Sequence, residues 1–82
     1  MLMARYFFDV SDDELLRDEE GLEFADAQCA AHEALQSLPD MAKRLLPTMG
    51  SETVAITMRN EHGTALYRAK LTIEGVWLQD EQ

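Results

Sequence analysis

The sequence has 82 residues, the length of one domain, and a chain this short buries only about two-thirds of the surface it exposes when unfolded. Apolar residues make up 46% of it, which excludes a disordered chain. The net charge of −9 argues against binding to nucleic acid or to an anionic membrane surface. We therefore expect one domain over residues 1–82, with no nucleic-acid partner and no membrane partner.

The first segment, residues 4–10, alternates as a half-buried strand does. The face that we expect to pack on the core carries Tyr6, Phe8 and Val10. The opposite face carries Arg5, Phe7 and Asp9. Phe7 departs from the pattern, because a large aromatic side chain falls on the face expected to meet water.

Residues 9–26 are strongly acidic and include nine of the sixteen acidic residues, against one base, Arg17. We expect a turn at 11–13, a short strand at 14–17 and a turn closed by Gly21. Four apolar side chains interrupt the acidic segment and are expected to pin it to the core: Leu15, Leu16, Leu22 and Phe24.

A long helix is expected after Asp26, which is a good N-cap residue. An apolar stripe follows at helical spacing for about five turns. Pro39 lies inside the stripe and removes one backbone hydrogen bond. The helix either kinks there or restarts with Ser37 as a new cap, and the unbroken phase of the stripe favours one kinked helix. Pro47 and Gly50 are expected to end it.

The last third of the chain predicts a β-hairpin, because residues 54–59 and 64–73 alternate on either side of the turn sequence 60–63. Gly75 is expected to break the second strand before residues 76–78. Together the elements predict an α+β fold of order β-β-α-β-β. A small antiparallel sheet of three to four strands would pack one face on one long helix. No second layer is expected over the other face.

The acidic segment contains no convincing metal or catalytic site. A calcium loop beginning at Asp9 requires glycine at its sixth position, where the chain has Glu14. Catalytic carboxylates need environments that separate their pKa values, whereas three consecutive carboxylates on one turn share an environment. These three are Asp18, Glu19 and Glu20. We expect one of them to accept backbone N–H groups and fix the turn.

Cys29 is the only cysteine, whereas a small secreted domain carries an even set for disulfides. The N-terminus has no signal-peptide pattern, so the expected location is the cytoplasm. Cys29 and His32 are neighbours on a helix, but a zinc site needs three or four ligands and only the distant His62 remains. We expect an accessible thiol, no metal, no cofactor and no enzymatic activity.

The outer face of the sheet carries the residues that we favour for function. Phe7 and Leu66 are apolar on that face, and Arg68 lies at its rim. Trp77, near the C-terminus, belongs to the residue type most enriched at binding hot spots. A cluster of these residues would mark a surface for a protein partner. We expect that partner to be a second copy of the chain, bound through the outer face or through an exposed strand edge. In the alternative, Trp77 closes the core and the acidic segment covers Phe7.

Several stretches together resemble a known family. They are the aromatic strand 5–10, the Asp-Glu-Glu-Gly stretch at 18–21, the helix with its segment 37–42, and the turn at 60–63. The chain resembles a family of short bacterial proteins classed as a domain of unknown function. The resemblance supports the fold and implies no activity, substrate or cofactor.

A second functional hypothesis rests on the acidic residues. The patch of Asp18, Glu19 and Glu20 would dock on a basic protein, as an antitoxin or a nucleic-acid mimic does. The order of elements also resembles antitoxin domains at the level of architecture alone. Self-association and capture of a basic protein both remain open from the sequence.

Overall fold

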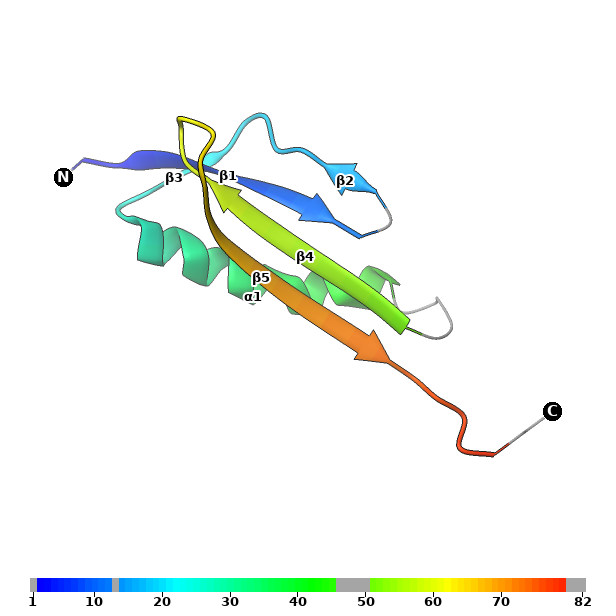
Figure 1. Cartoon of the computed structure of the whole chain (residues 1–82). Coiled ribbons are helices and arrows are strands. Elements are labelled where there is room, and N and C mark those ends of the chain that lie inside the picture. The colour runs from blue at the N-terminus through cyan, green and yellow to red at the C-terminus, as the bar shows by residue number, and fades with distance from the viewer. Residues whose placement is uncertain (1, 13, 46–50, 80–82) are drawn as a thin grey trace.

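A computed structural model describes residues 2–12, 14–45 and 51–79. The elements in chain order, drawn in Figure 1, are β1 (Ala4–Ser11), β2 (Leu15–Leu16), β3 (Leu22–Phe24), α1 (Ala27–Leu45), β4 (Ser51–Arg59) and β5 (Ala65–Glu74). The predicted α+β class is confirmed. The sheet has five strands, where three or four were expected.

The sheet is antiparallel and has the order β2-β1-β4-β5, with β3 also paired to β1. The two shortest strands pair with opposite ends of β1: β3 with residues 4–6, and β2 with residues 10–11. The predicted short strand at 14–17 exists as the two residues of β2. Strand β3 was missed, because three residues are too few to show a period.

Helix α1 is a single helix of 19 residues with Pro39 inside it, so the favoured single helix is confirmed and the alternative of a restart at Ser37 is wrong. Asp26 caps the helix as expected, because its Oδ1 accepts the N–H of Cys29 at 2.8 Å. The predicted stop at Pro47 and Gly50 lies outside the described residues.

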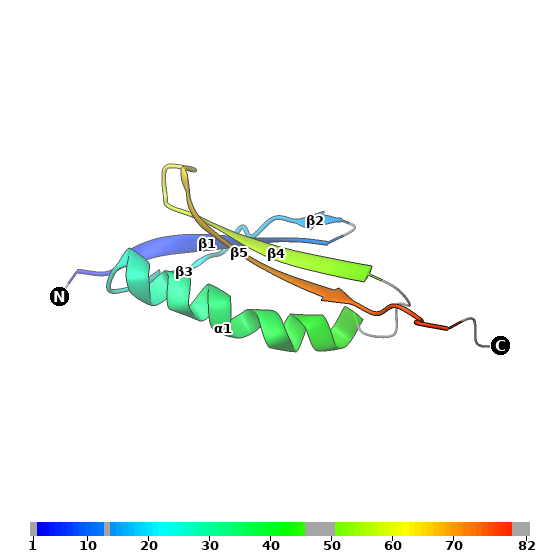
Figure 2. The same ribbon diagram turned by 60° about the horizontal axis from the view of Figure 1, so that its bottom comes forward.

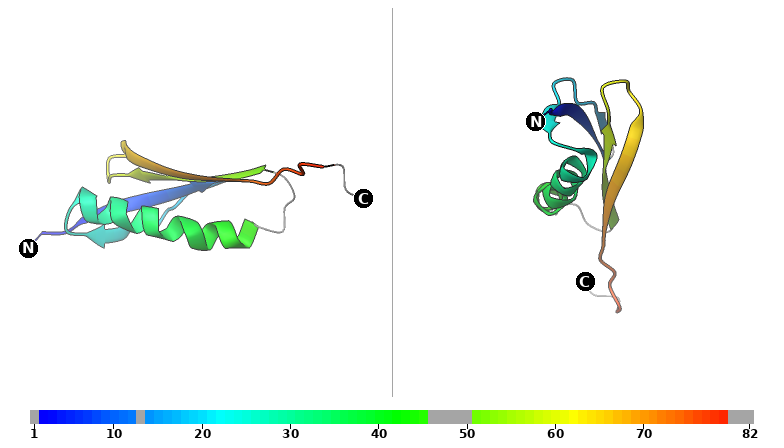
Figure 3. Two further views of the ribbon diagram at one scale, coloured as in Figure 1. Left: turned by 90° about the horizontal axis from the view of Figure 1, so that it is seen from below. Right: turned by 90° about the vertical axis from the view of Figure 1, so that its left-hand side faces the viewer.

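The helix covers one face of the sheet (Figures 2 and 3). Its buried side chains pack on β4, β5 and β1 in two adjoining clusters, which include Tyr6, Ala30, Ala34, Leu38, Val54, Ile56, Met58 and Ala69. Phe8 and Val10 pack against these clusters. The predicted inner face of the first strand is therefore confirmed.

The leucines of the acidic segment do not pin it to the core, which corrects our expectation. Leu15 and Leu16 are each 65% exposed and Leu22 is 55% exposed. Only Phe24 packs inward, with its ring 5.9 Å from that of Phe8. The reason is lateral distance: α1 packs mainly on β4 and β5, whereas β2 lies at the opposite edge of the sheet.

The predicted hairpin is confirmed, with β4 paired to β5 over nearly its full length. Asn60 closes the turn, because its Oδ1 accepts the N–H groups of His62 and Thr64. Opposite Arg59 the register shifts by one residue. Leu66 is therefore an extra, bulged residue near the start of β5.

Candidate functional site

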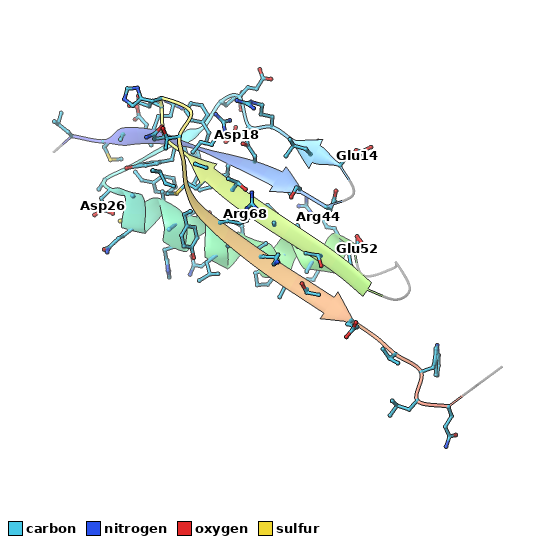
Figure 4. The ribbon with its side chains drawn as sticks, in the orientation of Figure 1. Glu14, Asp18, Asp26, Arg44, Glu52 and Arg68 are labelled. Carbon is cyan, nitrogen blue, oxygen red and sulfur yellow. The ribbon has the colours of Figure 1, made fainter. Side chains whose placement is uncertain are left out.

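The carboxylate of Asp18 occupies the gap between β2 and β3 along β1. Its Oδ2 accepts the N–H of Phe8 at 3.0 Å, and its Oδ1 accepts the N–H groups of Glu20 and Gly21, each at 3.0 Å. A carboxylate thus replaces the strand backbone that would otherwise bond to Phe8. The expected structural role of one acid in the Asp-Glu-Glu-Gly stretch is confirmed (Figure 4).

A buried ion pair holds this turn against the sheet. Arg59 donates from Nε to Oδ2 of Asp9 at 2.7 Å, and from its second terminal nitrogen to Oδ1 at 3.0 Å. The same nitrogen donates to the carbonyl of Asp18 at 2.8 Å. Asp9 also accepts the N–H of Asp18 at 2.9 Å. Asp9 was expected on the exposed face, but it is buried because Arg59 and the turn cover it.

Phe7 is enclosed by the same arrangement. The guanidinium of Arg59 lies 5.1 Å from the centre of the Phe7 ring, within the range of a cation–π contact. The backbone of Gly21 passes so close that an added Cβ would lie 2.9 Å from Phe7. The acidic segment therefore half-covers Phe7, as the alternative interpretation of the sequence had it.

The carboxylates of Asp9, which is buried, and of Asp18, which is half-buried, should make the stability of the fold depend on pH. Arg59 lowers the pKa of Asp9 below its ordinary 3.8, against the effect of burial. Burial would raise the pKa of Asp18, but the N–H groups of Phe8, Gly21 and Glu20 together lower it. Because both pKa values are lower in the folded state, this stability is complete above the unfolded pKa and is lost as the pH falls through the folded values.

We therefore expect the free energy of unfolding to decline steeply as the pH is lowered from about 5 towards 2. Urea unfolding followed by circular dichroism over that range measures it. Asp18→Asn should flatten the decline, because one of the two carboxylates is gone. An unchanged slope in this variant would contradict the role given to Asp18.

The remaining chemistry-bearing side chains do not converge. Glu19 and Glu20 are exposed. Over residues 2–12, 14–45 and 51–79, no three His, Cys, Asp or Glu side chains gather as metal ligands do. Cys29 is exposed as expected, and its hydrogen-bond partner Asp26, rather than His32, raises the pKa of the thiol. A raised pKa makes the thiol a poorer nucleophile at neutral pH.

The far edge of the sheet is formed by β5, which in the described parts of the chain is paired only with β4. In an antiparallel sheet each residue turns its N–H and C=O to the same side. Phe8 on β1 donates its N–H to Asp18, away from β4. Met58, which lies opposite Phe8 on β4, therefore directs its backbone groups away from β1 and towards Tyr67 on β5. Because the direction alternates along a strand, the backbone groups of Arg68, Lys70 and Thr72 point to the unpaired side of β5, here called the free edge.

The free edge carries some of the devices that protect edge strands and lacks others. Arg68 and Lys70 add charge and Leu66 forms a bulge at its N-terminal end. No proline interrupts it, so the backbone groups of residues 68–72 remain available to an added strand. Helix α1 crosses behind β5, and its first turns lie on the side of β5 that faces away from β4 (Figure 1). Between these turns and β5 runs an apolar groove of about 260 Å³, lined by Ala27, Gln28, Ala31, Met58, Leu66 and Tyr67.

Beyond β5 the chain leaves the body of the domain (Figures 1 and 3). This exposed tail, residues 76–78, consists of three consecutive apolar residues. Trp77 is 73% exposed, Val76 71% and Leu78 94%. Trp77 therefore does not close the core of the single chain, and the interpretation that placed it there is wrong.

The structure does not bring the four candidate interface residues together in one cluster. Leu66 is 46% exposed at the bulge of β5, and Arg68 lies on the outer face, where its Nε donates to Oγ1 of Thr57 at 3.1 Å. Leu66, Arg68 and Trp77 follow one another along the β5 edge and its tail, whereas Phe7 lies under Arg59.

Comparison with known families gives one match. The family described as a domain of unknown function (DUF6894) matches residues 5–72. The chain belongs to the DUF6894 family. Neither the curated proteins nor the solved structures contain a match to the chain. Along the described residues of this DUF6894 chain, no helix is long and apolar enough to cross a membrane.

The family match includes the hydrogen-bonded turn of this DUF6894 chain and excludes its tail. The Asp9–Arg59–Asp18 network lies wholly inside the matched residues 5–72, and the exposed tail lies outside them. Sequence reasoning missed Arg59, because it is separated from Asp9 by 50 positions and belongs to no local pattern. The sequence feature that could have indicated the network was Phe7, because an aromatic side chain on the face expected to meet water suggests that something covers that face.

Proposed function

We propose that this DUF6894 protein is a non-enzymatic, cytoplasmic interaction domain that associates with a second copy of itself through the free edge of β5. The observation that carries the proposal is the edge itself: β5 has ten residues, the backbone groups of Arg68, Lys70 and Thr72 face away from β4 with no strand paired to them in the described parts of the chain, and an apolar tail follows its end. Strand addition at such an edge supplies main-chain hydrogen bonds, and neighbouring apolar pockets supply selectivity.

The small size of the domain supports the same function. Among the residues that the structure describes, the largest fully buried side chains are those of Ile56 and Met58. A domain of this length commonly gains stability from association. Asp9 and Asp18, the two carboxylates most withdrawn from solvent in the described part of the acidic segment, already hold the turn in place. Their structural role supports a function in binding another protein rather than in catalysis.

Proline at position 70 should prevent the association. The N–H of Lys70 faces the free edge, so Lys70→Pro removes a donor that β4 does not use, and it blocks a strand added at that edge. Sedimentation of the native protein over a range of concentrations should give a dimer, and Lys70→Pro should give a monomer with an unchanged circular dichroism spectrum.

Lys70→Ala is the matched control, because it removes the same side chain and keeps the N–H. It should remain dimeric. A native protein that stays monomeric at every concentration would refute self-association, and a dimer that persists in a folded Lys70→Pro variant would move the interface away from β5.

A second candidate function is supported by the exposed acids. Of the predicted acidic patch, Glu19 and Glu20 are exposed on the segment that leads into β3, whereas Asp18 is held by the backbone of its turn. The whole chain carries a charge of −9. Such a surface suits a basic partner protein. Capture of a basic protein from lysate that weakens strongly with added salt would favour this function. Association through β5 should not weaken in that way.

A further inference from the structure

We propose that the tail of one copy, residues 76–78, docks in the groove between α1 and β5 of a second copy. The two β5 strands would pair antiparallel about a twofold axis at Leu71. This inference deepens the proposed self-association and rests on it. Each copy completes the apolar groove of the other, and the groove is incomplete in a single chain.

The charges on β5 exclude several registers. An axis at Ala69 would place Arg68 directly opposite Lys70 of the second copy, and an axis at Lys70 would place the two Lys70 side chains opposite each other. Like charges directly opposite one another destabilise a strand pair. An axis at Tyr67 avoids like charges but pairs only residues 65–69 of β5, so the favoured axis lies nearer the C-terminal end of the strand.

An axis at Leu71 gives favourable side-chain pairs on both faces of the extended sheet. On the outer face Lys70 comes opposite Thr72, and the cation Arg68 comes opposite the anion Glu74 of the second copy. On the helix face Leu71 comes opposite Leu71, and Ala69 comes opposite Ile73. The apolar layer under the sheet then continues across the axis without a break.

An axis at Thr72 is the nearest competitor. It avoids like charges too, because Lys70 then comes opposite Glu74. It pairs only residues 70–74 of β5, whereas the axis at Leu71 pairs residues 68–74. The longer overlap forms more main-chain hydrogen bonds, which favours Leu71.

The same register carries the tail to the groove. Continuing the pairing past the end of β5 places Val76 opposite Leu66 of the second copy, and both residues are exposed in the single chain. Trp77 then lies beside Leu66, at the groove that the first turns of α1 form with β5. The groove is open and mainly apolar, and it lies within reach of the Trp77 side chain in this register, which favours that side chain as its occupant.

Trp77 is the only tryptophan, so its fluorescence reports on the tail directly. We expect its emission to lie at long wavelength in dilute, monomeric samples and to shift to shorter wavelength as the dimer forms. The midpoint of the shift should coincide with the midpoint of dimerisation in sedimentation. Lys70→Pro should keep the long-wavelength emission at every concentration.

A charge in the groove should weaken the dimer without disturbing the fold. Gln28 is exposed and lines the groove, and Gln28→Glu keeps its shape. A carboxylate in the first turn also favours the helix, so the monomer should remain folded. Burying that carboxylate under Trp77 should weaken dimerisation roughly tenfold. Gln36→Glu, at another exposed position of α1, adds the same charge and should weaken it less than twofold.

Disulfide formation tests the register. In a Cys29→Ser background, Leu71→Cys should oxidise readily to a covalent dimer, because residues opposite at the axis are close enough to bridge. Thr72→Cys should not, since an axis at Leu71 holds its two copies farther apart than the roughly 7 Å limit between Cα atoms. Coupling through Thr72→Cys alone would overturn the register at Leu71.

The outcomes separate this inference from the proposed function. A protein that is monomeric throughout would refute both. A dimer in which Trp77 keeps its long-wavelength emission, or in which Gln28→Glu and Gln36→Glu behave alike, would refute the docked tail while self-association stands.

Discussion

Replacing Arg59 with methionine is expected to lower the free energy of unfolding by about 3–5 kcal/mol. The side chain and that of Asp9 are only 13% and 10% exposed, so the variant leaves a buried carboxylate without its cation. It also removes the donor to the carbonyl of Asp18. A loss of this size approaches the total stability of a small domain. Urea unfolding at one fixed protein concentration measures it.

Arg5, on β1, provides a more exposed comparison at the same turn. It pairs with Glu23 at 3.5 Å, with the two side chains 41% and 55% exposed, and it donates to the carbonyls of Glu20 and Gly21. Because Arg5→Met leaves no buried charge without a partner, it should cost less than Arg59→Met, about 1 kcal/mol. The variant Asp9→Leu/Arg59→Met should lose less than the sum of its single changes, because neither charge is left alone. Equal losses for Arg5→Met and Arg59→Met would contradict the buried pair.

Gly21→Ala is expected to lower the free energy of unfolding by about 3 kcal/mol, through a backbone cost and a steric cost. The φ angle of Gly21 is +71°, in the left-handed region that costs other residues about 1–2 kcal/mol. The new Cβ would also lie 2.8 Å from the carbonyl oxygen of Tyr6 and 2.9 Å from Phe7. Relief of these overlaps requires the turn to move off β1, which adds a cost of the same order.

Gly63→Ala measures the backbone part of that effect without the steric part. Gly63 has a φ of +85°, and no heavy atom lies within 4 Å of the position that a Cβ would take there. It should therefore lose only about 1–2 kcal/mol, from the backbone alone. Thermal unfolding of the two variants compares them, and equal shifts in Tm would show that the close approach at Gly21 carries no strain.

The regular elements follow from short-range patterns and were predicted well. Alternation in residues 4–10 gave β1 and its inner face, and the Asn-Glu-His-Gly turn gave the hairpin. The apolar stripe gave α1, and its unbroken phase across Pro39 correctly favoured one helix. In each case the pattern extends over enough residues to define a period.

The missed features depend on long-range geometry. The exposure of Leu15 and Leu16 follows from the lateral position of α1 over the sheet, which no local period specifies. The burial of Asp9 depends on Arg59, a residue of another strand. The candidate site has the same limit: the sequence offered Leu66 and Trp77 as separate apolar residues, and only the pairing of β5 places them along one edge.

The distance along the chain between Asp9 and Arg59 has a consequence for how the protein is made. These two residues lie 50 positions apart, so a growing polypeptide cannot close their contact until most of the domain has left the ribosome. The turn at Asp18 is held by that contact, so it should become ordered late in folding. Contacts so far apart along the chain also slow folding. The acidic stretch at residues 18–21 is thus expected to be among the last parts of the domain to fold.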